Sequence, residues 1–247
     1  APVRVARTGD RRWWELPAWP PPTTSRRWRL ATSGRLAGAP STHPAGPAVP
    51  TAARTAGSAV ATDPTAADLG VTEICAQFRY DPADPTPAVG GRLLTPDAGV
   101  RDNRRLAARA DVVAFTTPPL PHDLVVAGAP TVEVDHVADP PHADVFVRLC
   151  DVAPDGRAHN IADGMRRRDP AVGPITIELD PCFHRVAAGH RLALLVAGGA
   201  HPRFLRNNGT GEPPADAVGL VAVIHRIRGG TLTLPITEDH QLFHRPA

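Results

Sequence analysis

Short apolar runs, each bounded by turn residues, recur through the second half of the chain and constrain its fold more than any other feature. Residues 175–179 read ITIEL and alternate apolar with polar side chains, as a half-buried strand requires. The triplet LTL at residues 232–234 repeats this pattern. Further runs of β-forming residues lie at 111–117, 124–137, 145–152, 192–196 and 220–227.

Turn and helix signals complete this pattern. Asp155-Gly156 stands between two of the predicted strands, and both residue types tolerate the positive φ of a tight hairpin. The segment DNRRLAAR at 102–109 is the only helical pattern, and Asp102 can cap its first turn. Many short strands without intervening long helices predict an all-β, antiparallel sandwich of jelly-roll type, not a doubly wound α/β sheet.

The N-terminal part of the chain has a different composition. Residues 1–37 carry all four Trp around a proline run at 20–22, and proline cannot donate to a sheet ladder. We therefore expect an ordered extension that packs through its rings and contains no regular central strand. Residues 38–70 are mostly Ala, Pro, Thr, Gly and Ser and predict a long loop, because few large side chains offset the entropy of ordering it. The sandwich is expected over residues 71–247.

Charge and cysteine content exclude several classes of function. The formal net charge is +2, and the basic residues, all Arg, are interspersed with acidic ones, which argues against nucleic acid as a partner. Three cysteines at wide spacing predict neither a disulfide framework nor a CxxC metal site and favour a reducing compartment. The longest apolar stretch is far shorter than a membrane span. We expect a cytoplasmic protein without a membrane partner.

A search for a nucleophile finds no credible one. A serine hydrolase places its Ser at a strained elbow, usually as GxSxG, and none of the four serines, at positions 25, 33, 41 and 58, lies in that motif. Cys182 and His184 are two residues apart on a predicted strand, so their side chains share one face. Activation would need a third, orienting group, so we interpret Cys182 as a structural thiol. We predict no catalytic residue in this chain.

Metal and phosphate sites are not expected either. His136 and His142, with three nearby Asp at 135, 139 and 144, make the most metal-like cluster, but a polar loop between strands explains it better. The glycine-rich segments at 189–191 and 206–211 favour tight turns, because a phosphate cradle needs a helix start and a cation behind it. We expect no metal and no cofactor.

Several strings resemble, in order, the C-terminal domain of the CocE/NonD hydrolases, the family of cocaine esterases and X-Pro dipeptidyl-peptidases. FRYDPADPTPAVGGRLL resembles the opening of that domain, and later segments resemble its TT strand, its DVxPDGR hairpin and its GHRL strand with the RNxxTG loop. The matching segments are 2–22, 78–94, 108–120, 143–167 and 187–213. The first of these is similar to the passage out of the catalytic domain.

The resemblance implies a galactose-binding-like jelly roll that follows a separate α/β-hydrolase domain carrying the Ser, Asp and His triad. It implies that residues 1–37 are an extension from that catalytic domain, the expected partner, which would act on a small ester or X-Pro peptide. By position, Leu93, Leu94 and Thr95 would help to wall its acyl pocket. Arg206 and Asn207 are candidates for contacts with that domain, or for a self-contained loop network of hydrogen bonds. Contacts within a homo-oligomer are a further expectation, and the chain alone should be inactive.

Two alternatives of another class stay open at the level of sequence. Galactose-binding-like sandwiches often bind carbohydrate, but only fold analogy supports that use here. The aromatic residues of the strand region, which a sugar site would have to expose, fall mostly at core-like positions: Phe78, Tyr80, Phe115, Phe146, Phe183 and Phe204. A freestanding binding protein derived from a truncated hydrolase is the other alternative.

Overall fold

The computed structural model describes residues 3–38, 74–168, 170–213 and 216–238, and nearly all regular structure in these ranges is β. The elements are β1 (Val3–Arg7), β2 (Arg12–Leu16), β3 (Thr24–Ala31), the 3-10 turn η1 (Thr32–Gly34), β4 (Arg35–Gly38), β5 (Ala76–Tyr80), α1 (Arg104–Ala107), β6 (Val112–Thr116), β7 (Leu124–Gly128), β8 (Thr131–Asp139), β9 (Ala143–Val152), β10 (Ala158–Arg168), β11 (Pro174–Glu178), β12 (Cys182–Val186), β13 (Arg191–Ala197) and β14 (Val223–Thr237). Among the described residues, no helix has the length and apolar character needed to cross a membrane.

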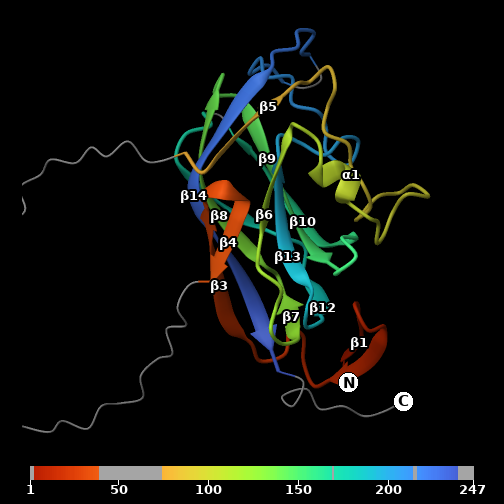
Figure 1. The fold of residues 1–247 in the computed structure, drawn as a ribbon. Helices are drawn as coiled ribbons and strands as arrows, with labels where there is room; N and C mark the ends of the chain where they lie inside the picture. Colours follow the sequence, from red (N-terminus) through yellow and green to blue (C-terminus); the bar gives the residue numbers. More distant parts are fainter. Residues whose placement is uncertain (1–2, 39–73, 169, 214–215, 239–247) are drawn as a thin grey trace, which may run out of the picture.

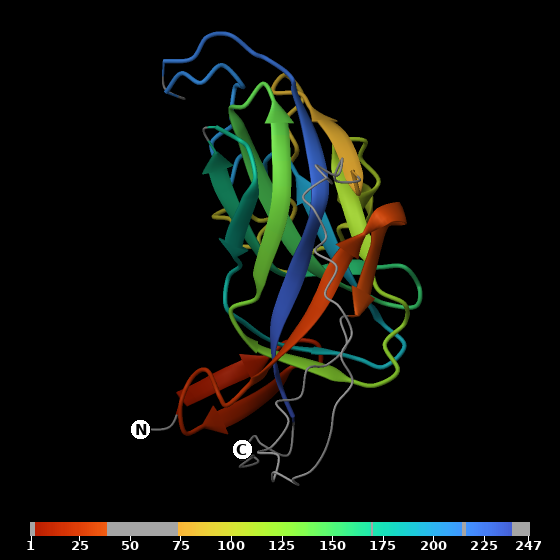
Figure 2. The ribbon, with the colours of Figure 1, turned by 90° about the vertical axis from the view of Figure 1, so that its left-hand side faces the viewer.

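Twelve strands form one continuous sheet that folds over itself into two layers (Figure 1). One layer follows the order β10-β9-β13-β6 with antiparallel neighbours, and a single parallel bridge between Arg35 and Thr116 links it to β4. The other layer is built on β14, which pairs with β3, β5, β7 and β8, while β11 extends it beyond β8 (Figure 2). The predicted all-β sandwich is confirmed. The hairpin β1–β2 lies beside β12 as a separate two-stranded sheet.

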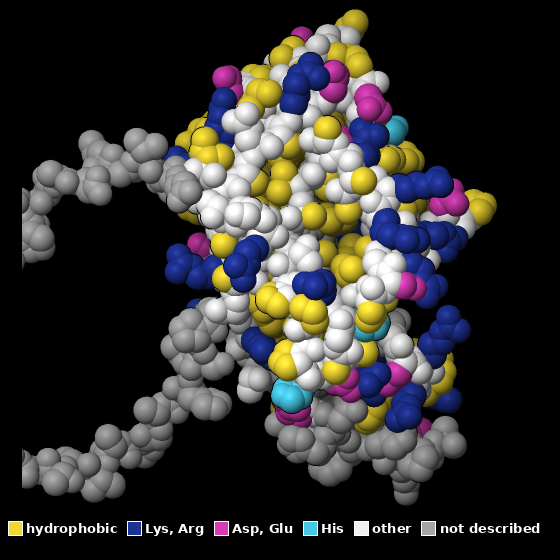
Figure 3. Space-filling model, in the orientation of Figure 1, with side chains coloured by type: hydrophobic (Ala, Val, Ile, Leu, Met, Phe, Trp, Pro, Cys, Tyr) yellow, Lys and Arg dark blue, Asp and Glu magenta, His cyan; other side chains and the backbone are white. Residues whose placement is uncertain are grey.

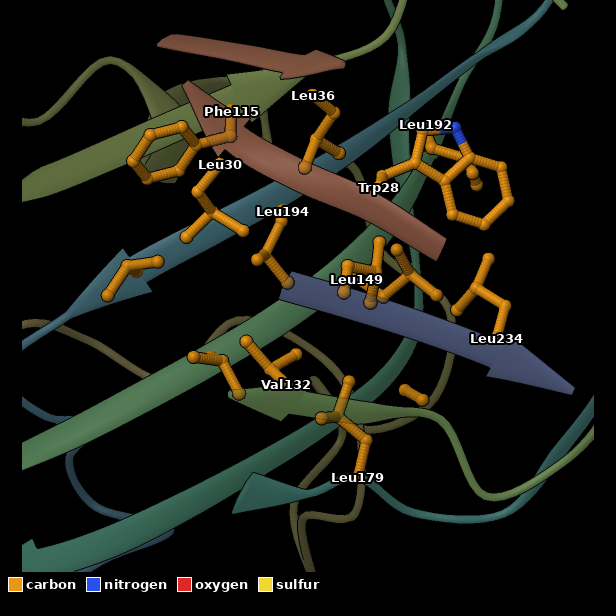
Figure 4. Packing of buried hydrophobic residues seen from close by; sticks show 14 of the residues in the cluster. Trp28, Leu30, Leu36, Phe115, Val132, Leu149, Leu179, Leu192, Leu194 and Leu234 are labelled. Carbon is orange, nitrogen blue, oxygen red and sulfur yellow. The ribbon is translucent and has the colours of Figure 1, made fainter. Parts of the chain in front are cut away.

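The core lies between the layers, and both contribute to it. Phe115 on β6 and Leu149 on β9 are fully buried, as is Leu194 on β13. Trp28 of β3 and Leu234 of β14 come from the opposite layer into the same cluster (Figure 4). Alternate side chains of a strand point to opposite faces, so a two-layer fold buries one set from each layer.

The N-terminal part departs from the expected extension. Residues 1–37 were expected to contain no regular central strand, yet β3 is paired on both sides, with β14 and with β4. The prolines at 20–22 fall in the connection before β3, so they do not interrupt its ladder. The sandwich therefore includes strands that precede the expected boundary at residue 71. Residues 39–70 of the expected loop lie outside the described residues, and Gly38 ends β4.

The remaining local predictions are mostly confirmed, with two adjustments. Asp155-Gly156 forms the turn between β9 and β10, with Gly156 at φ 85°. The helix is confirmed as the short α1, and Asp102 accepts a hydrogen bond from the Arg104 backbone N–H at 3.1 Å. The run predicted at 220–227 begins only at Val223. It continues through a bulge near Gly229 into the LTL segment, so one long strand replaces two.

Candidate functional site

The three residues expected to wall a pocket lie on one loop, residues 88–101, which we call the wall loop. Its legs are joined by a bridge between Gly91 and Gly99, whose backbone N–H groups donate to each other's carbonyls at 2.7 and 2.9 Å. The loop projects from the side of the molecule that carries α1 (Figure 1). The tip, residues 92–98, is therefore held at its base like a short hairpin.

Two consecutive glycines make this base possible. Gly90 and Gly91 have φ of 68° and 79°, a region that side chains with a Cβ rarely adopt. A Cβ on Gly90 would lie 2.6 Å from the Gly99 carbonyl oxygen. On Gly91 it would lie 3.0 Å from a carboxylate oxygen of Asp163. Only glycine allows the backbone to turn and to approach its neighbours this closely.

The tip exposes an apolar side chain to solvent. Leu94 has a relative exposure of 106%, Leu93 is half-buried and Thr95 is exposed. The three predicted residues, consecutive in the chain, thus lie on one projecting loop, and no described part of the chain covers Leu94. An exposed leucine on an anchored loop costs little within a single chain but gains about 2 kcal/mol when a partner buries it.

A cluster of charged side chains lies under the base of the wall loop. Arg148 is buried and donates from Nε and Nη2 to Oδ2 of Asp163, at 3.2 and 2.8 Å. Arg203 pairs with the other carboxylate oxygen of Asp163, and its Nη2 donates to Asp180 at 2.9 Å. Arg92, the first residue of the tip, is 3.0 Å from Asp180. Sequence reasoning missed this cluster, although an arginine inside the apolar run VFVRLCDV was a signal for it.

A cavity of about 950 Å³ adjoins the wall loop, between the tip of the β1–β2 hairpin and the β9–β10 turn. Val100 of the wall loop and Trp13 of the hairpin both line it. In Figure 3, dark-blue Lys and Arg side chains gather along the right-hand edge of the molecule, with Asp and Glu side chains among them.

Two histidines share one carboxylate at the floor of this cavity. His184 Nε2 lies 3.1 Å from Oδ2 of Asp151, and His190 Nδ1 lies 2.7 Å from Oδ1. Burial raises the pKa of Asp151, but the hydrogen bonds with His184 and His190 outweigh it, and the pKa falls below its usual value. Asp151 is therefore a carboxylate that only accepts, so both imidazole nitrogens donate to it.

Thr8 completes this set, which we call the histidine clamp (Thr8, Asp151, His184 and His190). The Thr8 hydroxyl is 2.7 Å from His184 Nδ1 and 3.1 Å from the Phe183 carbonyl oxygen. The order hydroxyl, imidazole, carboxylate matches a catalytic triad, but a hindered secondary hydroxyl shared with a backbone carbonyl is a poor nucleophile. The Thr8 backbone also bonds to β12 through Phe183 and Arg185, so we interpret the clamp as an attachment of the hairpin to the sandwich. The sequence did not reveal the clamp, because only Ser and Cys were considered as nucleophiles. Thr8 and His184 also lie 176 residues apart in the chain.

Arg206 and Asn207 bond within the chain. Arg206 donates from Nη1 to the Pro82 carbonyl oxygen at 3.0 Å and from Nε to Asn208 at 3.1 Å. Asn207 Nδ2 donates to Asp144 at 2.9 Å, and its Oδ1 accepts from the Gly209 N–H at 2.9 Å. These hydrogen bonds are those expected if Arg206 and Asn207 belong to a self-contained loop network.

The other titratable candidates are separated by the fold. His136 leaves the predicted loop cluster and contacts His225 across the sheet, at 3.0 Å between Nε2 and Nδ1. Burial raises the pKa of the Cys182 thiol to about 12, so it is protonated, while His184 faces Asp151 instead.

In the ranges that the structure covers, no three His, Cys, Asp or Glu side chains are placed to hold a metal ion. Ser25 and Ser33 lie on β3 and η1, and the serines at 41 and 58 are outside the described residues.

Comparison with known proteins places these features in context. Residues 1–233 match the family model described as the X-Pro dipeptidyl-peptidase C-terminal non-catalytic domain. The cocaine esterase of Rhodococcus sp. (strain MB1 Bresler) is 33% identical over 155 residues, which cover 57% of this chain and 27% of the esterase. The chain thus spans about a quarter of the length of that relative.

Solved structures agree on the fold. An α-amino acid ester hydrolase superposes over 95% of this chain and 41% of its own, with a TM-score of 0.71 and 21% identity. An aminopeptidase of a Thaumarchaeota archaeon covers 96% of this chain and 40% of its own, with a TM-score of 0.67 and 20% identity. At such identity the likeness establishes the fold, with most of each relative lying outside the matched region.

Proposed function

Because this chain belongs to the family of X-Pro dipeptidyl-peptidase C-terminal non-catalytic domains, we propose that it packs on an α/β-hydrolase catalytic domain and forms one wall of its acyl pocket. The hydrolase would act on small esters or on X-Pro amides. Leu93, Leu94 and Thr95 would provide the wall. The β1–β2 hairpin, at the N-terminal end of the domain, would connect the two parts.

The fully exposed Leu94 on the anchored wall loop carries this proposal. Backbone hydrogen bonds and two glycines at positive φ fix the base of this loop, and its tip holds Leu94 in water. A neighbouring domain that covers this side chain would explain both the exposure and the anchoring. The hairpin projects from the same side of the molecule, so a domain joined to β1 has a short path to the wall loop (Figure 1).

Arg206 and Asn207 have a secondary place in this proposal. Their hydrogen bonds fix the loop that follows Arg203, and Leu205 in that loop is exposed. We propose that the loop touches the catalytic domain through its exposed side chains, while Arg206 and Asn207 hold its shape. Cys150 and Cys182 are free thiols, which supports placing the hydrolase in the cytoplasm.

The carbohydrate-binding alternative finds no support in these comparisons. The aromatic residues of the strand region mostly lie in the core, as their positions in the sequence predict, because Phe78, Tyr80, Phe115, Phe146 and Phe183 are all buried. Stacking on a sugar ring needs an exposed aromatic face.

The test uses this chain together with a hydrolase domain. The purified chain should show no turnover of p-nitrophenyl acetate or Gly-Pro-p-nitroanilide above buffer. Mixed with the catalytic part of the cocaine esterase lacking its own C-terminal domain, it should bind and raise esterase activity, because it supplies the missing wall. Leu94→Glu should weaken binding at least about tenfold, since a charge would be buried without a partner.

Val172→Glu is the matched control, because Val172 is an apolar side chain of 58% exposure in the connection between β10 and β11. It should leave binding unchanged. Absence of binding by the unsubstituted chain, or equal binding by Leu94→Glu, would overturn the proposal. Turnover by the chain alone that a serine-directed inhibitor abolishes would overturn it as well.

A further inference from the structure

We infer that the charged cluster under the wall loop, running in the order Arg148, Asp163, Arg203, Asp180 and Arg92, sets the position of the pocket wall. We call it the ion relay. Arg148, Asp163 and Arg203 are then positioning residues for Leu93, Leu94 and Thr95. The inference rests on the proposed function only for what the tip does, not for how the tip is held.

The relay starts in the core. The Arg148 side chain is 0% exposed, and its Nε and both terminal nitrogens have acceptors. Besides Asp163, these are Oδ1 of Asn103 at 2.8 Å and the carbonyl oxygen of Val89. Val89 belongs to the first leg of the wall loop, so the core arginine grips the loop backbone directly.

The relay then runs outward to the tip. Arg203, 11% exposed, bridges Asp163 and Asp180, and Asp180 in turn holds Arg92 at 3.0 Å. Charges alternate along all five members, so each carboxylate lies between two guanidiniums. The last member, Arg92, directly precedes Leu93. The relay therefore holds the loop on both sides of Gly91, at Val89 and at Arg92.

Gly91 lies against the middle of the relay. A Cβ at Gly91 would be 3.0 Å from Asp163 Oδ2, 3.2 Å from Arg148 Nη2 and 3.3 Å from Arg203 Nη1. The loop backbone thus packs directly on three charged groups. The Gly-Gly pair has a second role besides its positive φ, because it gives the relay room to contact the main chain.

The second leg of the loop is held by amides linked to the same arginine. Asn160 accepts from the Arg101 N–H at 2.8 Å and donates to the Gly99 carbonyl at 3.1 Å. Asn103, which accepts from Arg148, also donates to Asn160 at 3.3 Å. Both legs are therefore connected to one buried guanidinium by oriented hydrogen bonds.

Stability alone is a weak account of such a cluster. Burying ion pairs costs desolvation, and well-packed apolar side chains often stabilise a core as much or more. The cost is visible at Arg203, whose pKa falls to about 10 because of burial and of the nearby Arg148 and Arg92. Apolar packing would not orient a loop backbone, whereas bidentate guanidinium contacts do. The relay thus fixes the orientation of the wall-loop backbone, whose tip makes few packing contacts of its own.

The test measures backbone order in the whole chain, without any hydrolase domain. Arg203→Ala removes the middle of the relay, and amide hydrogen exchange in residues 92–98 should accelerate at least about tenfold, while exchange in the core strands stays slow. Arg203→Lys should restore only part of the protection, because one ammonium cannot replace a fork that bridges Asp163 and Asp180. Arg157→Ala, which breaks an exposed pair with Asp155 on the β9–β10 turn, is the control and should change nothing in the loop.

Arg92→Ala covers the case in which the Arg203 variants do not fold, because Arg92 is largely exposed. It should loosen the tip while leaving Val89 and the core protected. Unchanged loop exchange in a folded Arg203→Ala chain, or in Arg92→Ala, would overturn the inference. If the relay variants loosen the loop but no hydrolase domain binds the chain, the proposed function fails and the relay remains.

Discussion

His136 and His225 form a buried imidazole pair whose protonation the fold opposes. His225 is stacked on Phe78 at 4.5 Å between ring centroids and lies 3.0 Å from His136. Burial, with a contribution from Arg168, lowers the pKa of His136 from 6.5 to about 4. Burial and the neighbouring His136 lower that of His225 to about 3. Both rings are therefore neutral in the folded chain at pH 7.

Acid should destabilise the chain through this pair. The unfolded chain takes up protons near pH 6.5 and the folded chain only near pH 3 to 4, so the free energy of unfolding is fully retained above 6.5 and falls as the pH drops towards 4. One such shift corresponds to roughly 3 kcal/mol. Urea unfolding of His136→Gln should show a shallower decline over this range than the unsubstituted chain. His122→Gln, at an exposed position, should leave the slope unchanged, and equal slopes for all three chains would contradict the assignment.

At the scale of single elements, β3 illustrates how far sequence reasoning reached. Its tryptophan was expected to pack, and it does, but the proline run was taken to exclude a central strand from residues 1–37. Proline acts only on its own ladder position and the residue before it, and Thr24–Ala31 contains none. The ITIEL and VFVRLCDV runs were easier to assign, because each carries a strand-like pattern uninterrupted by proline.

Trp28 and Trp13 make a matched test of the role of β3. Trp28 is buried in the main core, whereas Trp13 on the hairpin is 55% exposed. Trp28→Ala should lower the free energy of unfolding by about 3–5 kcal/mol, because a large cavity opens between the layers. Trp13→Ala should cost less than about 1 kcal/mol. Equal losses in chemical unfolding would show that β3 is not a central strand, in line with the ordered extension that the sequence predicts.

The candidate site was only half readable from sequence, for a physical reason. Leu93, Leu94 and Thr95 are neighbours in the chain, so the resemblance of one string was enough to propose them as the pocket wall. The ion relay joins residues on β9, β10 and three separate loops, and the histidine clamp joins Thr8 to β12. Such contacts depend on which strands lie next to each other in the sheet. The alternation of apolar and polar side chains predicts single strands but not their order. The fold class followed from local pattern, while the support of the site followed from topology.

At the scale of the whole molecule, the position of β3 and β4 predicts which fragments can fold. These two strands connect β14 with β6, so they close the path from one layer to the other. A chain beginning at residue 71 would lose Trp28, Leu30 and Leu36 from the core and leave both β6 and β14 with unpaired edges. We expect it to be unfolded or aggregated, with no cooperative thermal transition by circular dichroism.

A chain beginning at residue 18 is the informative comparison. It loses the β1–β2 hairpin and the small cluster of Trp14 and Leu16 against Phe183, but keeps every strand of the twelve-stranded sheet. It should unfold cooperatively at a lower temperature, because Phe183 becomes exposed and His184 loses its contact with Thr8. If the chain from residue 71 folded as well as the chain from residue 18, β3 and β4 would be accessories to the sandwich. We expect the chain from residue 18 to be more stable than the chain from residue 71. That order would mean that the domain can fold without the hairpin but not without β3 and β4.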